Sequence, residues 1–123
     1  MASVPFRKNP RRAPSGWLGT IAVSGQSMNP TYNDGDWLLF RRFSGQGDTS
    51  IQKLLGRVLV IERESYPGIY YIKRCTQIID QRLWVEGDNS AASTDSREWG
   101  SIAPAEVRGV VLFRYKLAKV KRN

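Results

Sequence analysis

Residues 69–86 read IYYIKRCTQIIDQRLWVE, a β-type run over 69–79 that Asp80-Gln81 breaks before Leu83–Glu86 resumes it. Isoleucine, valine, tyrosine and tryptophan fit a pleated, half-buried surface, so this stretch predicts strands on both sides of the break. Similar short apolar runs, separated by turn residues, predict further strands at 17–24, 37–42, 57–63 and 107–117. Strands at this spacing, with few helices, predict an all-β fold: a compact barrel or sandwich of short, mostly antiparallel strands.

Helical segments are few and short. Ile51–Leu55 predicts one helical turn, which Thr49 or Ser50 would cap. Pro104–Val107 predicts a second, because proline suits a first helical position. Glycine and polar residues at 44–50 predict a loop. The chain therefore needs at most one or two helical turns.

The charge of the chain is concentrated at its two ends. The net charge is +8; residues 1–16 carry four cations and no acid, and residues 114–123 carry five cations and no acid. The remainder holds ten Lys or Arg residues against eleven Asp or Glu residues. We therefore expect a flexible basic arm at 1–16, a single domain at 17–117 and a basic tail at 118–123. Basic ends can bind nucleic acid, anionic lipid or an acidic partner, or can simply be solvated.

Two residue counts exclude whole classes of chemistry. The 123 residues contain no histidine and one cysteine, Cys75. This excludes Ser-His-Asp and Cys-His catalysis, imidazole metal sites, internal disulfides and all-thiolate zinc sites. No segment approaches the roughly 20 apolar residues of a membrane span, and Trp17–Val23 is too short for a secretory signal. A cytoplasmic location is expected on these grounds.

The first candidate segment for chemistry is Ser24-Gly25-Gln26-Ser27-Met28-Asn29-Pro30-Thr31. Ser27 lies just after a β-type run and before a proline that stiffens the turn, and a glycine two residues earlier allows close approach of another backbone. The alternative interpretation is a serine-rich turn with no catalytic role.

The second candidate is Lys73, inside the apolar and aromatic run Tyr70–Cys75. Because side chains alternate along a strand, Lys73 shares a face with Tyr71 and Cys75, and Arg74 lies on the other. One of these two cations would be drawn inward. Burial lowers the pKa of a lysine by disfavouring its charged form, and a neutral amine is a usable general base. The alternative is a surface strand with two solvated cations.

The third candidate is the polar stretch 87–100, whose Asp, Asn, Ser and Arg side chains can fix a structured loop. The three segments together resemble the signal peptidase I family of Ser/Lys endopeptidases. The motifs are Gly-x-Ser-Met-x-Pro-Thr at 25–31, Lys-Arg at 73–74 and Gly-Asp-Asn-x-x-x-Ser-x-Asp-Ser-Arg-x-Trp-Gly at 87–100, with Gly109 also fitting. The resemblance covers about residues 20–115 and implies the signal-peptidase-like version of the all-β fold.

The resemblance implies roles for individual residues. Ser27 would be the nucleophile, and Lys73 would be the general base, which later protonates the leaving amine. Ser93 would orient the lysine amine, and Asp95 and Arg97 would form a structural ion pair that shapes its loop. The backbone N–H of Ser27 would supply one oxyanion-hole donor. No metal or organic cofactor is implied.

Substrate recognition in this family resembles strand addition, in which an extended peptide of a precursor protein pairs with backbone beside the serine motif. The residues expected to bind substrate are Gly25, Gln26, Met28 and Tyr71. Some family members carry a serine hydroxyl at the position of Gly25, so that side-chain oxyanion donor is missing here.

The short middle of the chain and the lack of an N-terminal anchor make it similar to the compact, anchorless nickel superoxide dismutase maturation proteases. That likeness implies removal of an N-terminal extension from the dismutase precursor in the cytoplasm. Two alternatives stay open. One is a signal peptidase that reaches the membrane surface through its basic ends and cleaves exported preproteins. The other is a basic β-barrel that binds single-stranded nucleic acid, which is disfavoured because most aromatic residues fit strand patterns.

Overall fold

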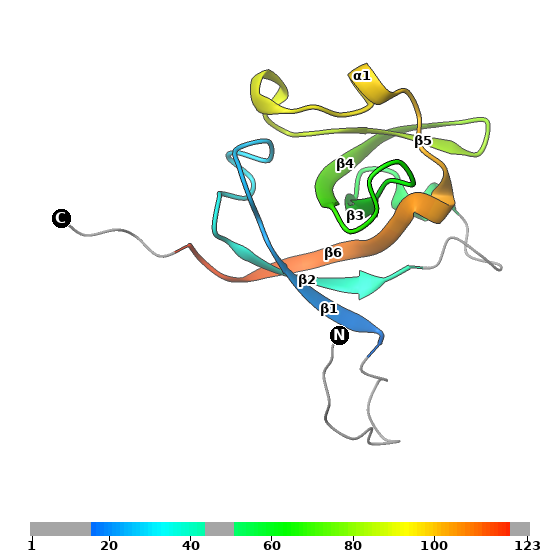
Figure 1. Cartoon of the computed structure of the whole chain (residues 1–123). Coiled ribbons are helices and arrows are strands. Elements are labelled where there is room, and N and C mark those ends of the chain that lie inside the picture. The colour runs from blue at the N-terminus through cyan, green and yellow to red at the C-terminus, as the bar shows by residue number, and fades with distance from the viewer. Residues whose placement is uncertain (1–15, 44–50, 119–123) are drawn as a thin grey trace.

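Six antiparallel strands form one sheet in the order β1-β2-β6-β3-β4-β5 (Figure 1). The computed structural model describes residues 16–43 and 51–118. Its strands are β1 (Leu18–Ala22), β2 (Trp37–Arg42), β3 (Val58–Glu62), β4 (Tyr70–Ile79), β5 (Arg82–Glu86) and β6 (Val107–Lys116). The all-β prediction is confirmed. Within the described residues the two edge strands β1 and β5 do not pair, so the sheet is not closed into a barrel.

The helical content of the described residues is one α-helical turn and three 3-10 turns. These are η1 (Ile51–Leu54), η2 (Ser90–Ala92), α1 (Ser96–Trp99) and η3 (Pro104–Glu106). Two of them, η1 and η3, lie where the sequence predicts helical turns. The predicted arm at 1–16 and tail at 118–123 lie outside the described residues, apart from Gly16 and Ala118, as do the loop at 44–50 and the capping residues Thr49 and Ser50.

The central strand β3 is buried on both faces of the sheet, which explains its unbroken apolar run. Leu59 and Ile61 belong to one core cluster, together with residues of β4, β5 and β6. Val58 and Val60 belong to a second cluster on the other face. A strand covered on both faces has no polar alternation, because neither side meets water.

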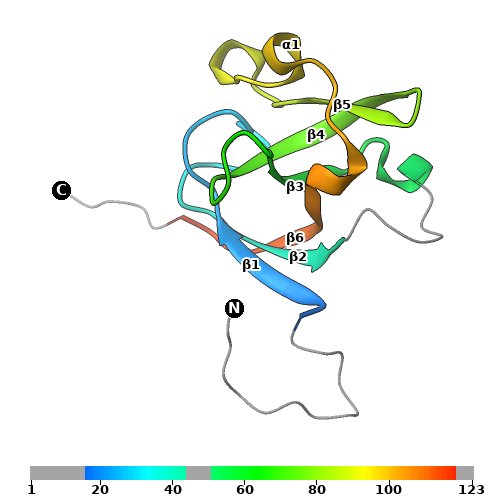
Figure 2. The ribbon, with the colours of Figure 1, turned by 45° about the vertical axis from the view of Figure 1, so that its right-hand side comes forward.

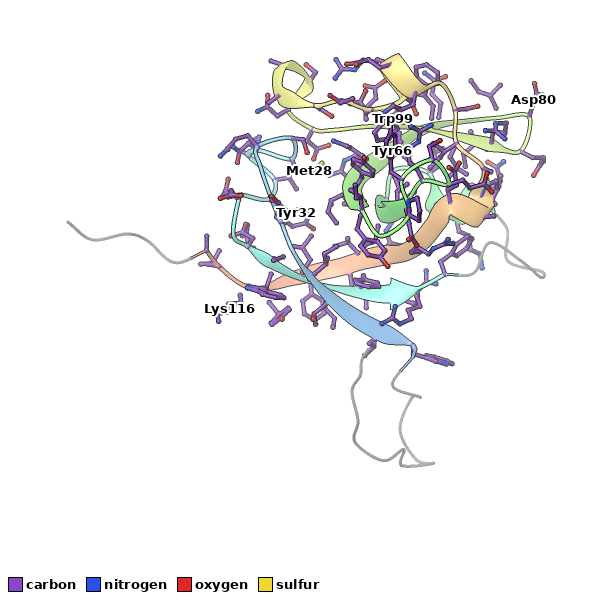
Figure 3. The ribbon with its side chains drawn as sticks, in the orientation of Figure 1. Met28, Tyr32, Tyr66, Asp80, Trp99 and Lys116 are labelled. Carbon is purple, nitrogen blue, oxygen red and sulfur yellow. The ribbon has the colours of Figure 1, made fainter. Side chains whose placement is uncertain are left out.

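A tight hairpin joins β4 to β5 at the break that the sequence predicts. Asp80 and Gln81 have φ values of 51° and 64°, and two residues of positive φ form the turn whose twist matches that of the strands it joins. Figure 3 shows Asp80 at the tip of this hairpin. A β-bulge between Cys75 and Gln77 interrupts the register of the pair.

The loop that follows β1 folds back over the second core cluster. Met28 is fully buried in that cluster and Tyr32 packs against it, so both lie between the loop and the sheet (Figure 3). This loop also carries Ser27, the neighbour of Met28. In Figures 1 and 2 it lies next to the loop that follows β5.

Asp36, at the start of β2, holds the end of β6 in place. Its carboxylate is 1% exposed and accepts hydrogen bonds from the backbone N–H groups of Asn33 and Ala118, at 2.8 Å each. Arg114 of β6 forms an ion pair with it at 3.1 Å. Burial alone would raise the pKa of Asp36, but these donors outweigh it and hold the pKa below its ordinary value.

The ring of Phe40 in β2 fits between two glycines of neighbouring strands. A Cβ atom at Gly19 of β1 or at Gly109 of β6 would overlap the Phe40 ring. Phe40 is 6% exposed and forms part of the second core cluster. The two glycines therefore let a large aromatic ring lie flat across the sheet at this point.

Candidate active site

Lys73 of β4 is a buried lysine. Lys73 is 5% exposed, and its neighbours Ile72 and Cys75 in the strand are core residues. Its Nζ donates a hydrogen bond to Ser93 Oγ at 3.0 Å. Burial lowers the pKa of Lys73, because the charged ammonium loses its hydration; Asp95 opposes the shift and Arg97 adds to it. Of the two cations that the sequence leaves open, Lys73 is the one drawn inward.

Ser93 connects that amine to a buried carboxylate. Its Oγ donates to Asp95 Oδ2 at 2.6 Å, and Asp95 is 1% exposed. Asp95 also accepts from the N–H of Gly87 and from Arg97 Nε, both at 2.9 Å. Burial alone would raise the pKa of Asp95, but these hydrogen bonds hold it well below its ordinary value.

The same carboxylate starts α1. Asp95 is the N-cap of the helix, and its side chain accepts from the backbone N–H of Arg97 at 3.2 Å. The Arg97 guanidinium also reaches the carbonyl groups of Ser90 and Ser93. The loop that presents Ser93 is thus fixed at both ends by one ion pair and its backbone contacts.

Ser27 and Lys73 line the same cavity, of about 110 Å³. Tyr70 and Ile72 of β4 and the chain from Ile21 to Ser24 contribute to its walls. Among the described residues the Ser27 N–H donates no hydrogen bond, whereas its carbonyl accepts one from the N–H of Asn89 at 2.8 Å. The half-buried Ser27 and the buried Lys73 therefore lie on the walls of one cavity.

Gly87 allows the loops of Ser27 and Ser93 to meet. A Cβ atom built at Gly87 would lie 2.6 Å from the carbonyl oxygen of Ser27 and 2.7 Å from Ser93 Cβ, and closer still to Ser93 Oγ. Real Cβ atoms are not found at such distances, so only glycine fits here. From the sequence, Gly87 is recognisable only as part of the polar loop, and its position at the start of that motif is the one signal of this role.

Arg74 has a separate structural role that the sequence analysis missed. It forms a two-pronged ion pair with Asp88, both contacts being 2.9 Å, and Thr31 donates to the same carboxylate at 2.6 Å. These bonds fasten the loop after β5 to the turn that follows Ser27. The pattern Lys-Arg followed by Gly-Asp is the signal that could have identified this pair.

The four residues expected to bind substrate lie in different surroundings. Met28 and Tyr71 line the cavity, but Met28 is fully buried and Tyr71 packs edge-on against Trp99 with ring centres 5.0 Å apart. Gly25 has a φ of 87° and donates its N–H to Asp34. Gln26 is exposed, and its carbonyl accepts from Asn89.

A larger groove of about 840 Å³ adjoins the cavity, and Ile21 and Tyr70 line both. Along this groove β1 pairs only with β2, so among the described strands its outer edge is free. A free edge strand can accept an added peptide strand. No group of three His, Cys, Asp or Glu side chains in the described part of the chain is placed to hold a metal ion.

Comparison with known proteins identifies relatives. Residues 73–116 match the family model described as "Signal peptidase, peptidase S26". Mitochondrial inner membrane protease subunit 1 of Xenopus tropicalis is 32% identical over an alignment of 117 residues, and the match covers 80% of this chain and 70% of the relative. The Homo sapiens subunit 1 is 32% identical (78% and 68% covered), and subunit 2 of Danio rerio is 33% identical (71% and 58% covered).

The expectation of a cytoplasmic location is wrong in view of these relatives, which are subunits of inner membrane proteases and point to association with a membrane. The relatives named here are also not nickel superoxide dismutase maturation proteases. Among the residues that the structure describes, no helix has the length and apolar character that a membrane crossing requires.

Proposed function

The chain belongs to the S26 signal peptidase family, and on that premise we propose that it is a serine endopeptidase in which Ser27 is the nucleophile and Lys73 the general base. The observation that carries the proposal is the buried amine of Lys73, which shares a cavity with Ser27. A lysine in water is protonated at neutral pH and cannot accept a proton. Burial lowers the pKa of Lys73 and so raises the fraction of neutral amine, which can accept a proton.

The reaction is acyl transfer in two stages. Neutral Lys73 takes the proton from Ser27 Oγ as that oxygen attacks the scissile carbonyl, and the Ser27 N–H stabilises the resulting oxyanion. Lys73 then gives the proton to the leaving amine, which departs and leaves an ester on Ser27. Water, deprotonated by the same amine, hydrolyses the ester and restores the serine.

Ser93 acts as the positioning residue for Lys73. Its hydroxyl proton is donated to Asp95, which is ionised and can only accept, so the Oγ lone pairs are left to accept an N–H from Lys73. In this proposal the hydrogen bond to Ser93 fixes the amine by one N–H, and the lone pair of neutral Lys73 accepts the proton of Ser27. Asp95 acts through Ser93, and Arg97 keeps Asp95 ionised.

The substrate in this proposal is an extended segment of a precursor protein that adds to the free edge of β1. We further propose that the domain at 17–117 works at a membrane surface, which the inner membrane relatives and the basic ends of the sequence support. Flotation with anionic liposomes checks this: loss of binding when the basic ends are neutralised is expected, and flotation that does not depend on them counts against it.

The catalytic proposal is tested with purified variants and mass spectrometry of cleaved precursors. Ser27→Ala removes the nucleophile and Lys73→Ala removes the base, so both should be inactive and folded. Lys73→Arg should also be inactive, because guanidinium cannot serve as a neutral base. Thr94→Ala and Lys53→Ala change exposed residues and are the matched controls. Cleavage by any of the three site variants at near the wild-type rate would reject the assignment.

Two precursors separate the candidate substrates. One is a membrane-directed preprotein, and the other is the precursor of nickel superoxide dismutase.

The Ser93→Ala variant tests the role of Ser93. It should slow cleavage of the accepted substrate and shift the pH profile of the rate, whereas a residue that only shaped the loop would leave the pH profile unchanged.

A further inference from the structure

The large groove beside the cavity carries a charge that no residue of its own neutralises. Its apolar walls include Ile21, Phe43 and Val60, and three charged side chains reach it: Arg42, Glu62 and Arg108. Glu62 and Arg108 form an ion pair at 2.9 Å, so these two cancel. Glu62 also accepts the N–H of Gly68 at 2.7 Å; that bond and Arg108 hold its pKa below its ordinary value.

Arg42 is the cation that remains. Among the described residues no carboxylate lies within ion-pair distance of its guanidinium, which lies over the Phe40 ring at 5.4 Å from the ring centre. A Cβ at Gly19 would lie 3.0 Å from an Arg42 guanidinium nitrogen, so the side chain crosses Gly19. The flat ring between two glycines is thus a platform that positions Arg42 at the groove.

The position of Arg42 along β1 sets its distance from the catalytic residues. The backbone N–H of Arg42 donates to Trp17 at the far end of β1, and the guanidinium lies over Gly19. The walls of the Ser27 cavity begin at Ile21 and reach Ser24, two to five residues further along the chain than Gly19. At about 3.3 Å per extended residue, a peptide that runs beside β1 passes from Arg42 to this cavity within about five residues.

We propose that Arg42 forms a specificity subsite for an acidic side chain of the substrate, within about five residues of the scissile bond. The inference rests on the proposed peptidase function. The occupant is a peptide segment, because the groove shares Ile21 and Tyr70 with the walls of the Ser27 cavity and follows the edge of β1, which is free among the described strands. The carboxylate of an aspartate or glutamate pairs with the guanidinium while its neighbours contact the apolar walls.

The test uses fluorescence-quenched peptides with alanine on both sides of the scissile bond. A single glutamate, glutamine or lysine is placed at each successive position on either side of that bond. The wild-type protein should cleave the glutamate peptide with a kcat/KM about threefold above that of the lysine peptide at one such position, because a partly exposed ion pair is worth this much. The preference should weaken in high salt.

Variants identify the residue responsible. Arg42→Glu should reverse the preference at that position, and Arg42→Gln should remove it. Arg41→Glu makes the same change of net charge at an exposed neighbour outside the groove and should keep the wild-type preference. Thermal unfolding of each variant verifies its fold, and Arg42→Gln serves if Arg42→Glu does not fold.

Four results would overturn the inference. Cleavage of all peptides at one rate removes the subsite and leaves the peptidase proposal intact. A preference that survives Arg42→Glu, or that Arg41→Glu also reverses, assigns the effect to another residue or to net charge. Failure of the wild-type protein to cleave any peptide, with the precursor also uncut, overturns the proposed function together with the subsite.

Discussion

Gly87→Ala should separate the loops of Ser27 and Ser93, which form the candidate active site, by adding a single methyl group. The new Cβ would lie 2.6 Å from the Ser27 carbonyl oxygen and 2.7 Å from Ser93 Cβ, whereas an ordinary contact begins at 3.4 Å. The carbonyl or the loop must therefore retreat by about 0.8 Å, and misplacement of about 1 Å can reduce a rate about a hundredfold. Ser27 cannot move without straining its hydrogen bond from Asn89.

Stability and activity should respond to this substitution by different amounts. Overpacking of a buried site destabilises by about 1–3 kcal/mol, which lowers the melting temperature but leaves a folded protein. We expect kcat/KM for the accepted precursor to fall about a hundredfold at a temperature where the variant is still folded. Gly16→Ala adds a methyl group in open space and is the matched control. Activity of Gly87→Ala within about threefold of wild type would refute the close approach as a catalytic requirement.

The kcat/KM of the wild-type protein should rise with pH, with its midpoint below the ordinary lysine value of 10.5, because burial lowers the pKa of Lys73; a flat profile would count against the amine as base. Lys73→Met should be inactive, and its free energy of unfolding in urea should be higher than that of the wild type by about 1 kcal/mol or more at neutral pH, where the buried amine carries a charge. The gain should be smaller in alkali, and a variant less stable than the wild type would show that the buried amine does not destabilise the fold. Asp95 has a lowered pKa, so its stabilising effect is present above about pH 4 and is lost as the pH falls below that value; in Asp95→Asn the urea midpoint should change less across this range.

The strands were predictable because their signal is local. The apolar run that follows the turn residues Asn33–Asp36 placed β2 at its observed bounds, and the break at Asp80-Gln81 marks the hairpin turn. The choice among barrel, sandwich and open sheet was not predictable in the same way. It depends on β6 lying between β2 and β3, a pairing across many residues that no short pattern records.

The candidate active site was likewise predictable only in part. Strand alternation placed Lys73 and Arg74 on opposite faces, but only long-range contacts decide which is buried: Ser93 receives Lys73, and Asp88 pairs with Arg74. The burial of Asp36 was not predictable, because a carboxylate in a turn usually faces water. Its partners, Arg114 and the N–H of Ala118, come from the other end of the chain, which its neighbours in sequence do not reveal.

The hydrogen bond from the Ala118 N–H to Asp36 limits where the chain can be shortened or fused. Trimming the chain at Leu117 would strip a buried carboxylate of one of its three donor groups, and the turn that leads out of the serine loop would loosen with it. An affinity tag belongs after this anchoring point, because a fusion that pulls Ala118 away would disturb the turn at Asn33–Asp36, which follows the loop of Ser27.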